Sequence, residues 1–126
     1  MGDTSDQPEN YLPLTPAVFS ILLALAGGEK HGYAIMQEIA SSSALRIGPG
    51  TLYRSIKQLL GSGLIEESGE RPAPSLDDER RRYYRLTALG RRVVQAEAVR
   101  LARLVSLAQA NGLLGRKARA GIGRAR

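Results

Sequence analysis

Residues 31–65 read HGYAIMQEIASSSALRIGPGTLYRSIKQLLGSGLI, and this stretch decides the fold. Its apolar residues recur at helical spacing over 32–43 and again over 49–61. The glycines and the proline of 46–50 make a turn between the two segments, and Gly61-Ser62-Gly63 ends the second segment. The stretch therefore predicts two short helices joined by a tight turn.

An apolar helix is expected before this pair. Thr15 provides an N-cap oxygen, Pro16 suits the first helical position because it has no N–H, and Gly27-Gly28 ends the helix. The apolar residues of 16–26 cover most of the helix circumference, which is typical of a helix buried on more than one side. One of these sides can face a partner chain.

A β-hairpin and a long helix are expected after the pair. Residues 64–67 begin a strand, and 82–86, which include two tyrosines, form its partner across a long polar loop. Thr87 caps a helix over about 88–110. This order predicts a mainly α fold with a β-hairpin wing, namely a winged helix-turn-helix followed by a long C-terminal dimerisation helix.

The chain of 126 residues suffices for one compact core. We expect a flexible acidic leader over 1–10, a winged helix-turn-helix DNA-binding domain over 11–86, a dimerisation helix over 87–111 and a flexible basic tail over 112–126. The formal net charge of +6 divides into −3 for the leader, +5 for the tail and +4 for the rest. This balance favours an anionic partner such as nucleic acid, and a basic protein without such a partner is the alternative.

Composition and patterning argue against several other functions. The chain has no cysteine, which excludes disulfides, thiolate nucleophiles and redox chemistry of the protein itself. Its one histidine, His31, stands at a helix start, where capping or packing explains it without catalysis. We therefore expect no enzyme, no metal and no cofactor. The longest apolar run, 17–26, is far shorter than the roughly 20 residues of a membrane span, so we expect a cytoplasmic, nucleoid-associated protein.

The second helix of the pair has a polar face that suits DNA. Placed at 100° steps, the apolar residues of 49–61 gather on one side. Arg54 and Gln58 on the other side can bond guanine and adenine edges, and Lys57 suits phosphates. The DNA-contact candidates on this helix are Gly50, Thr51, Tyr53 at the border, Arg54, Lys57 and Gln58. An ordinary solvated face is the alternative.

The wing carries a cluster of arginines. We expect Arg80, Arg81 and Arg82 to contact phosphates at the base of the wing, with Arg71 nearer its tip. The acidic residues 77–79 precede the cluster, so local salt bridges are the alternative role for these arginines.

The last helix has an apolar seam whose members alternate steps of four and three residues. We expect a homodimer through this seam and parts of the N-terminal region. The candidate interface residues are Tyr11, Leu12, Phe19, Val94, Ala98, Leu101, Val105 and Ala108. Two recognition helices one DNA turn apart bind a pseudo-palindrome. The alternative is packing of this helix only on the first helix of its own chain.

Five stretches in register resemble the PadR-like transcriptional regulators. These are Leu14-Thr15-Pro16, His31-Gly32-Tyr33, 48–53, Gly63-Leu64-Ile65 and 81–90. The resemblance implies a winged-helix homodimer, built through the first and last helices, that binds operator double-stranded DNA and usually represses. It also implies that Thr51, Tyr53, Arg54, Lys57 and the wing arginines meet DNA, with Tyr33 near the backbone.

The single C-terminal helix places the chain with the compact members of that family. A small-molecule effector is not identifiable, since the chain has no tryptophan and one phenylalanine with which to hold an aromatic ligand. Two other functions stay open at this point: a winged-helix protein-interaction module, and a non-specific nucleic-acid binder driven by the basic tail.

Overall fold

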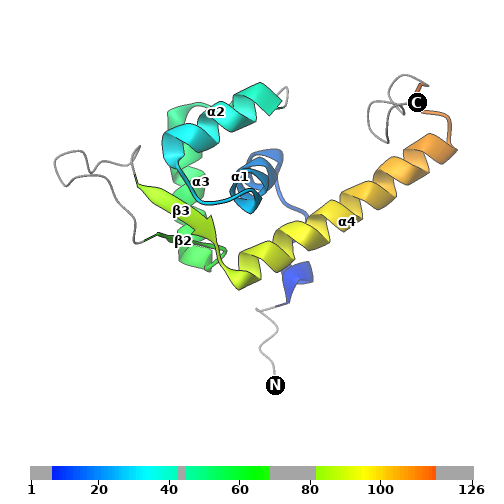
Figure 1. The fold of residues 1–126 in the computed structure, drawn as a ribbon. Helices are drawn as coiled ribbons and strands as arrows, with labels where there is room; N and C mark the ends of the chain where they lie inside the picture. Colours follow the sequence, from blue (N-terminus) through cyan, green and yellow to red (C-terminus); the bar gives the residue numbers. More distant parts are fainter. Residues whose placement is uncertain (1–6, 43–44, 69–81, 116–126) are drawn as a thin grey trace.

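The computed structural model describes residues 7–42, 45–68 and 82–115. Short helices and a small sheet form a compact body, from which one long helix extends (Figure 1). The elements in chain order are the 3-10 helix η2 (Pro8–Tyr11), α1 (Pro16–Ala26), β1 (Lys30–His31), α2 (Gly32–Ser42), α3 (Pro49–Ser62), β2 (Ile65–Glu67), β3 (Tyr83–Leu86) and α4 (Ala88–Ala110). The predicted fold class, mainly α with a β-hairpin wing, is confirmed.

The helix boundaries follow from caps that the sequence displays. The Val18 N–H donates to the Thr15 hydroxyl at 3.2 Å, and the Gly90 N–H donates to the Thr87 hydroxyl at 2.9 Å. These side chains satisfy N–H groups that the first turns of α1 and α4 leave unbonded. The helix α3 ends at Gly63, whose φ of 80° lies in the left-handed region that glycine adopts without strain.

The sheet has one strand more than the predicted hairpin. Its order is β1-β3-β2, and both pairings are antiparallel, with His31 opposite Tyr83 and Ile65 opposite Leu86. The additional strand β1 is two residues long, too short to show an alternating pattern in the sequence. Through this pairing, β1 joins the start of α2 to β3, the strand that follows the wing.

The core surrounds α1, whose Ile21 and Leu22 have no exposed surface. Contacts reach α1 from α2, α3, β3 and α4. The first turn of α4 fits tightly beside β2, because a Cβ at Gly90 would collide with the carbonyl oxygen of Leu64. The buried apolar residues are Ile21, Leu22, Ala24, Leu25, Ile35, Ile39, Leu52, Ile56, Leu59, Leu64, Ile65, Tyr84, Val93 and Val94.

The N-terminal segment contains a short helix that the sequence did not predict. Residues 8–10, which the sequence placed in a loose leader, belong to η2, and η2 packs against α4. Just beyond it, the Leu14 N–H donates to Oε2 of Glu97 at 2.9 Å. The packing of η2 and this hydrogen bond hold the segment on α4.

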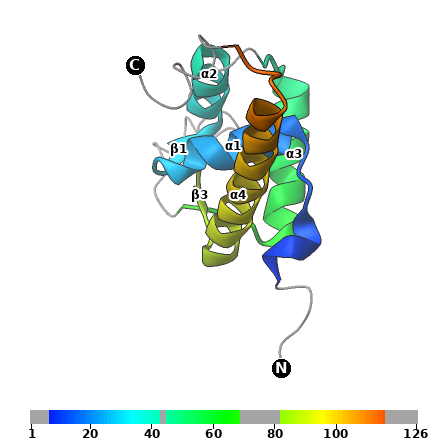
Figure 2. The same cartoon turned by 90° about the vertical axis from the view of Figure 1, so that its right-hand side faces the viewer.

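The second half of α4 extends beyond the core. Figure 1 shows this half leaving the body, and Figure 2 looks onto its projecting end. Leu104 is 50 % exposed there, whereas Val94 is 5 % exposed in the first half. Val94, a predicted dimer contact, therefore lies in the core of its own chain, because the seam begins while α4 still covers α1.

Among residues 7–42, 45–68 and 82–115, no helix is long and apolar enough to cross a membrane.

Candidate nucleic-acid interface

The polar face of α3 is held outward by the residues on its opposite side. Leu52, Ile56 and Leu59 are buried in the core, and this fixes the rotation of the helix about its axis. The predicted residues Gly50, Thr51, Arg54, Lys57 and Gln58 are all exposed. They form one continuous surface, which we call the polar face of α3.

Tyr53, at the border of this face, is partly buried. Its hydroxyl oxygen is buried, and a Cβ at Gly32 would lie 2.6 Å from it. The ring therefore packs on the start of α2, at a place that only a residue without a side chain leaves open. Tyr53 sets the approach of α2 to α3, and its contact with DNA stays a prediction.

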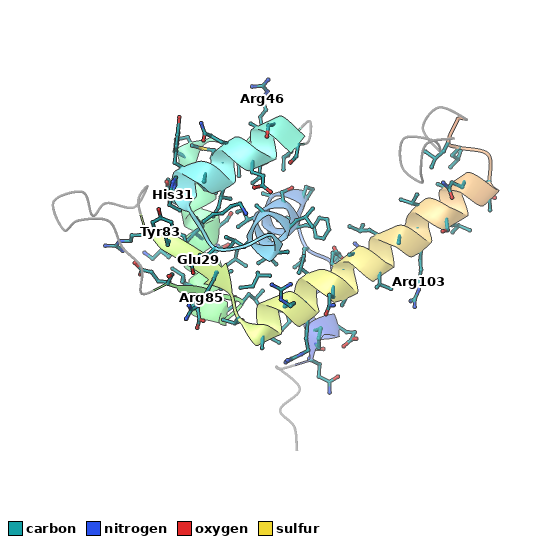
Figure 3. The ribbon with its side chains drawn as sticks, in the orientation of Figure 1. Glu29, His31, Arg46, Tyr83, Arg85 and Arg103 are labelled. Atoms are coloured by element: carbon teal, nitrogen blue, oxygen red, sulfur yellow. The ribbon has the colours of Figure 1, made fainter. Side chains whose placement is uncertain are left out.

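Tyr33 lies in the first turn of α2 and is 47 % exposed. The Ala34 N–H donates to Nδ1 of His31 at 3.1 Å, so the imidazole caps this turn as the sequence led us to expect. The His31 ring also meets Tyr83 edge to face, with ring centres 5.3 Å apart (Figure 3). The start of α2, where Tyr33 lies, is thus held beside β3 by His31.

The arginines at the base of the wing have acidic neighbours on β2. Nε of Arg85 donates to Oε2 of Glu66 at 2.8 Å, and this hydrogen bond raises the pKa of Arg85. Nε of Arg82 lies 3.8 Å from Oε2 of Glu67. These two arginines thus have acidic partners on β2, whereas the predicted partners, residues 77–79, lie outside the described residues. The other predicted wing contacts, Arg71, Arg80 and Arg81, lie outside the described residues.

Sequence reasoning missed the acidic partners. Ile65 opposite Leu86 sets a register in which Glu66 faces Arg85 and Glu67 faces Tyr84, two residues from Arg82. Strand alternation places such neighbours on a common face. A register assumed from the apolar pair of Ile65 with Leu86 could have found both ion pairs.

Like Glu66 and Glu67, Glu97 is an acidic residue that sequence reasoning did not single out. It is 1 % exposed and accepts hydrogen bonds from Leu14 N–H and from Nε and Nη2 of Arg100, the last two at 2.6 and 3.0 Å. The hydrogen bonds from Arg100 and then from Leu14 lower the pKa of Glu97 against the opposing effect of its burial. Glu97 therefore joins α4 to the segment that precedes α1.

The described part of the chain holds no cluster of three or more histidine, cysteine or acidic side chains that could bind a metal ion.

Comparisons with known proteins support the fold described above. The sequence model of the family described as "Transcriptional regulator PadR-like family" matches residues 21–96. A curated Streptomyces fradiae relative, an uncharacterized 37.1 kDa protein in a transposon, is 38% identical over 84 residues, or 67% of this chain and 22% of that protein. The chain spans about a fifth of that relative's length.

Solved structures share the fold. RosR of H. salinarum is 27% identical with a TM-score of 0.57, over 76% of this chain and 78% of that one. A PadR family transcription regulator from hypervirulent Clostridium difficile is 22% identical with a TM-score of 0.66, over 80% of this chain and 100% of that one. The second likeness concerns the fold alone.

Proposed function

Because the chain belongs to the PadR-like family of transcriptional regulators, we propose that it is a repressor that binds one specific, pseudo-palindromic operator as a homodimer. Regulators of this family are not enzymes. The observation that carries the proposal is the polar face of α3, where exposed side chains suited to base edges and to phosphates lie together near the base of the wing.

The chemistry of this face suits the major groove. The groove is about 12 Å wide and admits an α-helix, and in a helix-turn-helix the second helix enters it. Arg54 can bond two acceptors of a guanine, and Gln58, one turn further along, can bond an adenine. Thr51 and Lys57 flank them and suit the phosphates that position the helix.

The outer half of α4 supports a homodimer. The apolar stripe that faces the core through Val93 and Val94 continues along α4 after the core of the chain has ended. Its later members, which we call the outer stripe, are Ala98, Leu101, Leu104, Val105 and Ala108. At about 1.5 Å per residue the outer stripe covers about 15 Å of helix. A second copy of the same stripe covers it by symmetry.

The N-terminal residues contribute to the edge of this interface in the proposal. Tyr11, Leu12 and Phe19 are partly buried against the core and keep some exposed surface beside α4. Repression then follows from occupancy, since a dimer seated on an operator that overlaps a promoter excludes the polymerase.

The test is a titration of the purified protein into a labelled duplex from its own upstream region, beside a scrambled duplex, at two salt concentrations. We expect a preference of about a thousandfold or more for the upstream site, with two chains bound per duplex. The double variant Arg54→Ala, Lys57→Ala should lose the preference. The double variant Arg92→Ala, Arg103→Ala is the control, because it removes the same charge from exposed positions on α4.

Two further variants separate the alternatives. Replacing the five basic residues of 116–126 with glutamine should weaken the salt dependence and leave the sequence preference in place. A tail-driven nucleic-acid binder would lose its binding in this variant. A protein-interaction module would show equal, weak binding of both duplexes in every variant.

A further inference from the structure

A small cavity lies where α3 meets the base of the wing. It measures about 210 Å³ and is lined by Tyr53, Ile56, Lys57, Leu60, Arg82 and Tyr84. We call it the wing-base cavity. Two of its lining side chains, Lys57 from α3 and Arg82 beside β3, are cations, and the others are apolar or aromatic. The cavity therefore suits a compact anion.

An acidic side chain lies next to one of these cations. The Glu67 carboxylate is 3.8 Å from Nε of Arg82 and is partly buried. Because side chains alternate along a strand, Glu67 shares the sheet face of Tyr84, whereas Glu66 shares the opposite face with Arg85. The two acidic residues of β2 thus pair with arginines on different faces of the sheet.

We propose that the wing-base cavity binds one phosphate group of the DNA backbone between Lys57 and Arg82, and that Glu67 holds Arg82 until the phosphate takes its place. The proposal rests on the proposed function. Guanidinium groups bind carboxylate and phosphate with the same planar donors, so one anion can replace the other. The phosphate gains the second cation, Lys57, which outweighs the contact that Glu67 gives up.

The DNA backbone is the source of the phosphate that the position favours. The cavity opens between α3 and the wing, the two elements that meet DNA in a winged helix. A phosphate held there fixes the depth of α3 in the groove without reading sequence.

The test measures affinity for the scrambled duplex over a series of salt concentrations. Arg82→Gln should lower the slope of log K against log salt by about 0.9, the value for one phosphate contact. Glu67→Gln should tighten binding by about threefold or more, since the competing carboxylate is gone. Glu66→Gln is the matched control, because it removes the same charge from the other face, and it should tighten binding by less than twofold (~1.5).

Each result decides the proposal. An unchanged slope in Arg82→Gln, or equal effects of Glu67→Gln and Glu66→Gln, would overturn it. Sodium phosphate that displaces the protein from DNA better than sodium chloride at equal ionic strength would assign the cavity to free phosphate instead. If Arg82→Gln does not fold, the comparison of the two glutamate variants still decides. The scrambled duplex keeps this test separate from the proposed function, which fails only if the upstream site is not preferred.

Discussion

Replacing Glu97 with glutamine should destabilise the fold through one buried group. The carboxylate accepts the Leu14 N–H with one oxygen and Arg100 with both. A glutamine has one acceptor oxygen, so either Leu14 or Arg100 then faces an NH₂ donor. A buried donor without an acceptor costs about 1–3 kcal/mol. For a chain of this size each kcal/mol lowers Tm by about 3–6 °C.

The pH dependence has a definite sign. Hydrogen bonds from Arg100 and Leu14 lower the pKa of Glu97 in the folded protein. A carboxyl group whose pKa is lowered by folding contributes stability above its unfolded pKa of about 4.3 and loses this contribution as pH falls through the folded value. The wild type should therefore exceed Glu97→Gln in stability at pH 7, and the difference should shrink below about pH 4.

The assay is urea unfolding of both proteins at pH 7 and at acid pH, at one fixed protein concentration because a dimer couples stability to concentration. Glu66→Gln is the control, since Glu66 forms a similar pair with Arg85 on the exposed face of the sheet. Exposed pairs contribute little, so its shift should be much smaller. Equal shifts for Glu97→Gln and Glu66→Gln would refute the reasoning, as would an advantage of the wild type that grows toward acid pH.

Two further substitutions test the packing of α4. Gly90→Ala should strongly destabilise the fold in a thermal melt, because the new Cβ collides with the carbonyl of Leu64, whereas Gly61→Ala, with open space around it, should not. Leu104→Lys should shift the protein to a monomer in sedimentation. Val99→Lys, equally exposed at 51 % but on the opposite side of α4, should leave a dimer. A dimer in both variants would contradict the proposed interface along the outer stripe.

The elements that the sequence predicted best are those whose ends carry a chemical signal. Thr15 with Pro16 and Thr87 located the starts of α1 and α4, and both helices have the predicted bounds. The polar face of α3 was equally visible, because a helix with one buried side must expose the other. These features depend on residues that are close in sequence.

The features that were missed depend on residues far apart in sequence. Glu97 lies beside apolar seam positions and resembles a solvated residue until Leu14, 83 positions away, supplies its N–H. Tyr53 has a border position on a helical wheel, and the absence of a side chain at Gly32 leaves room for its hydroxyl beside α2. Neither contact has a periodic signal within its own segment.

These long-range contacts also explain how so small a sheet can position the wing. The Tyr53 ring on Gly32 joins α3 to α2, and the His31 ring on Tyr83 joins α2 to β3. The Thr87 hydroxyl donates to the Gly63 carbonyl at 2.6 Å, which joins the end of β3 to the end of α3. The three contacts close a loop around α3, so the polar face and the base of the wing keep their spacing before DNA arrives. Under the proposed function, binding to DNA then costs little free energy for ordering these elements, and discrimination between sites rests on the side chains of α3.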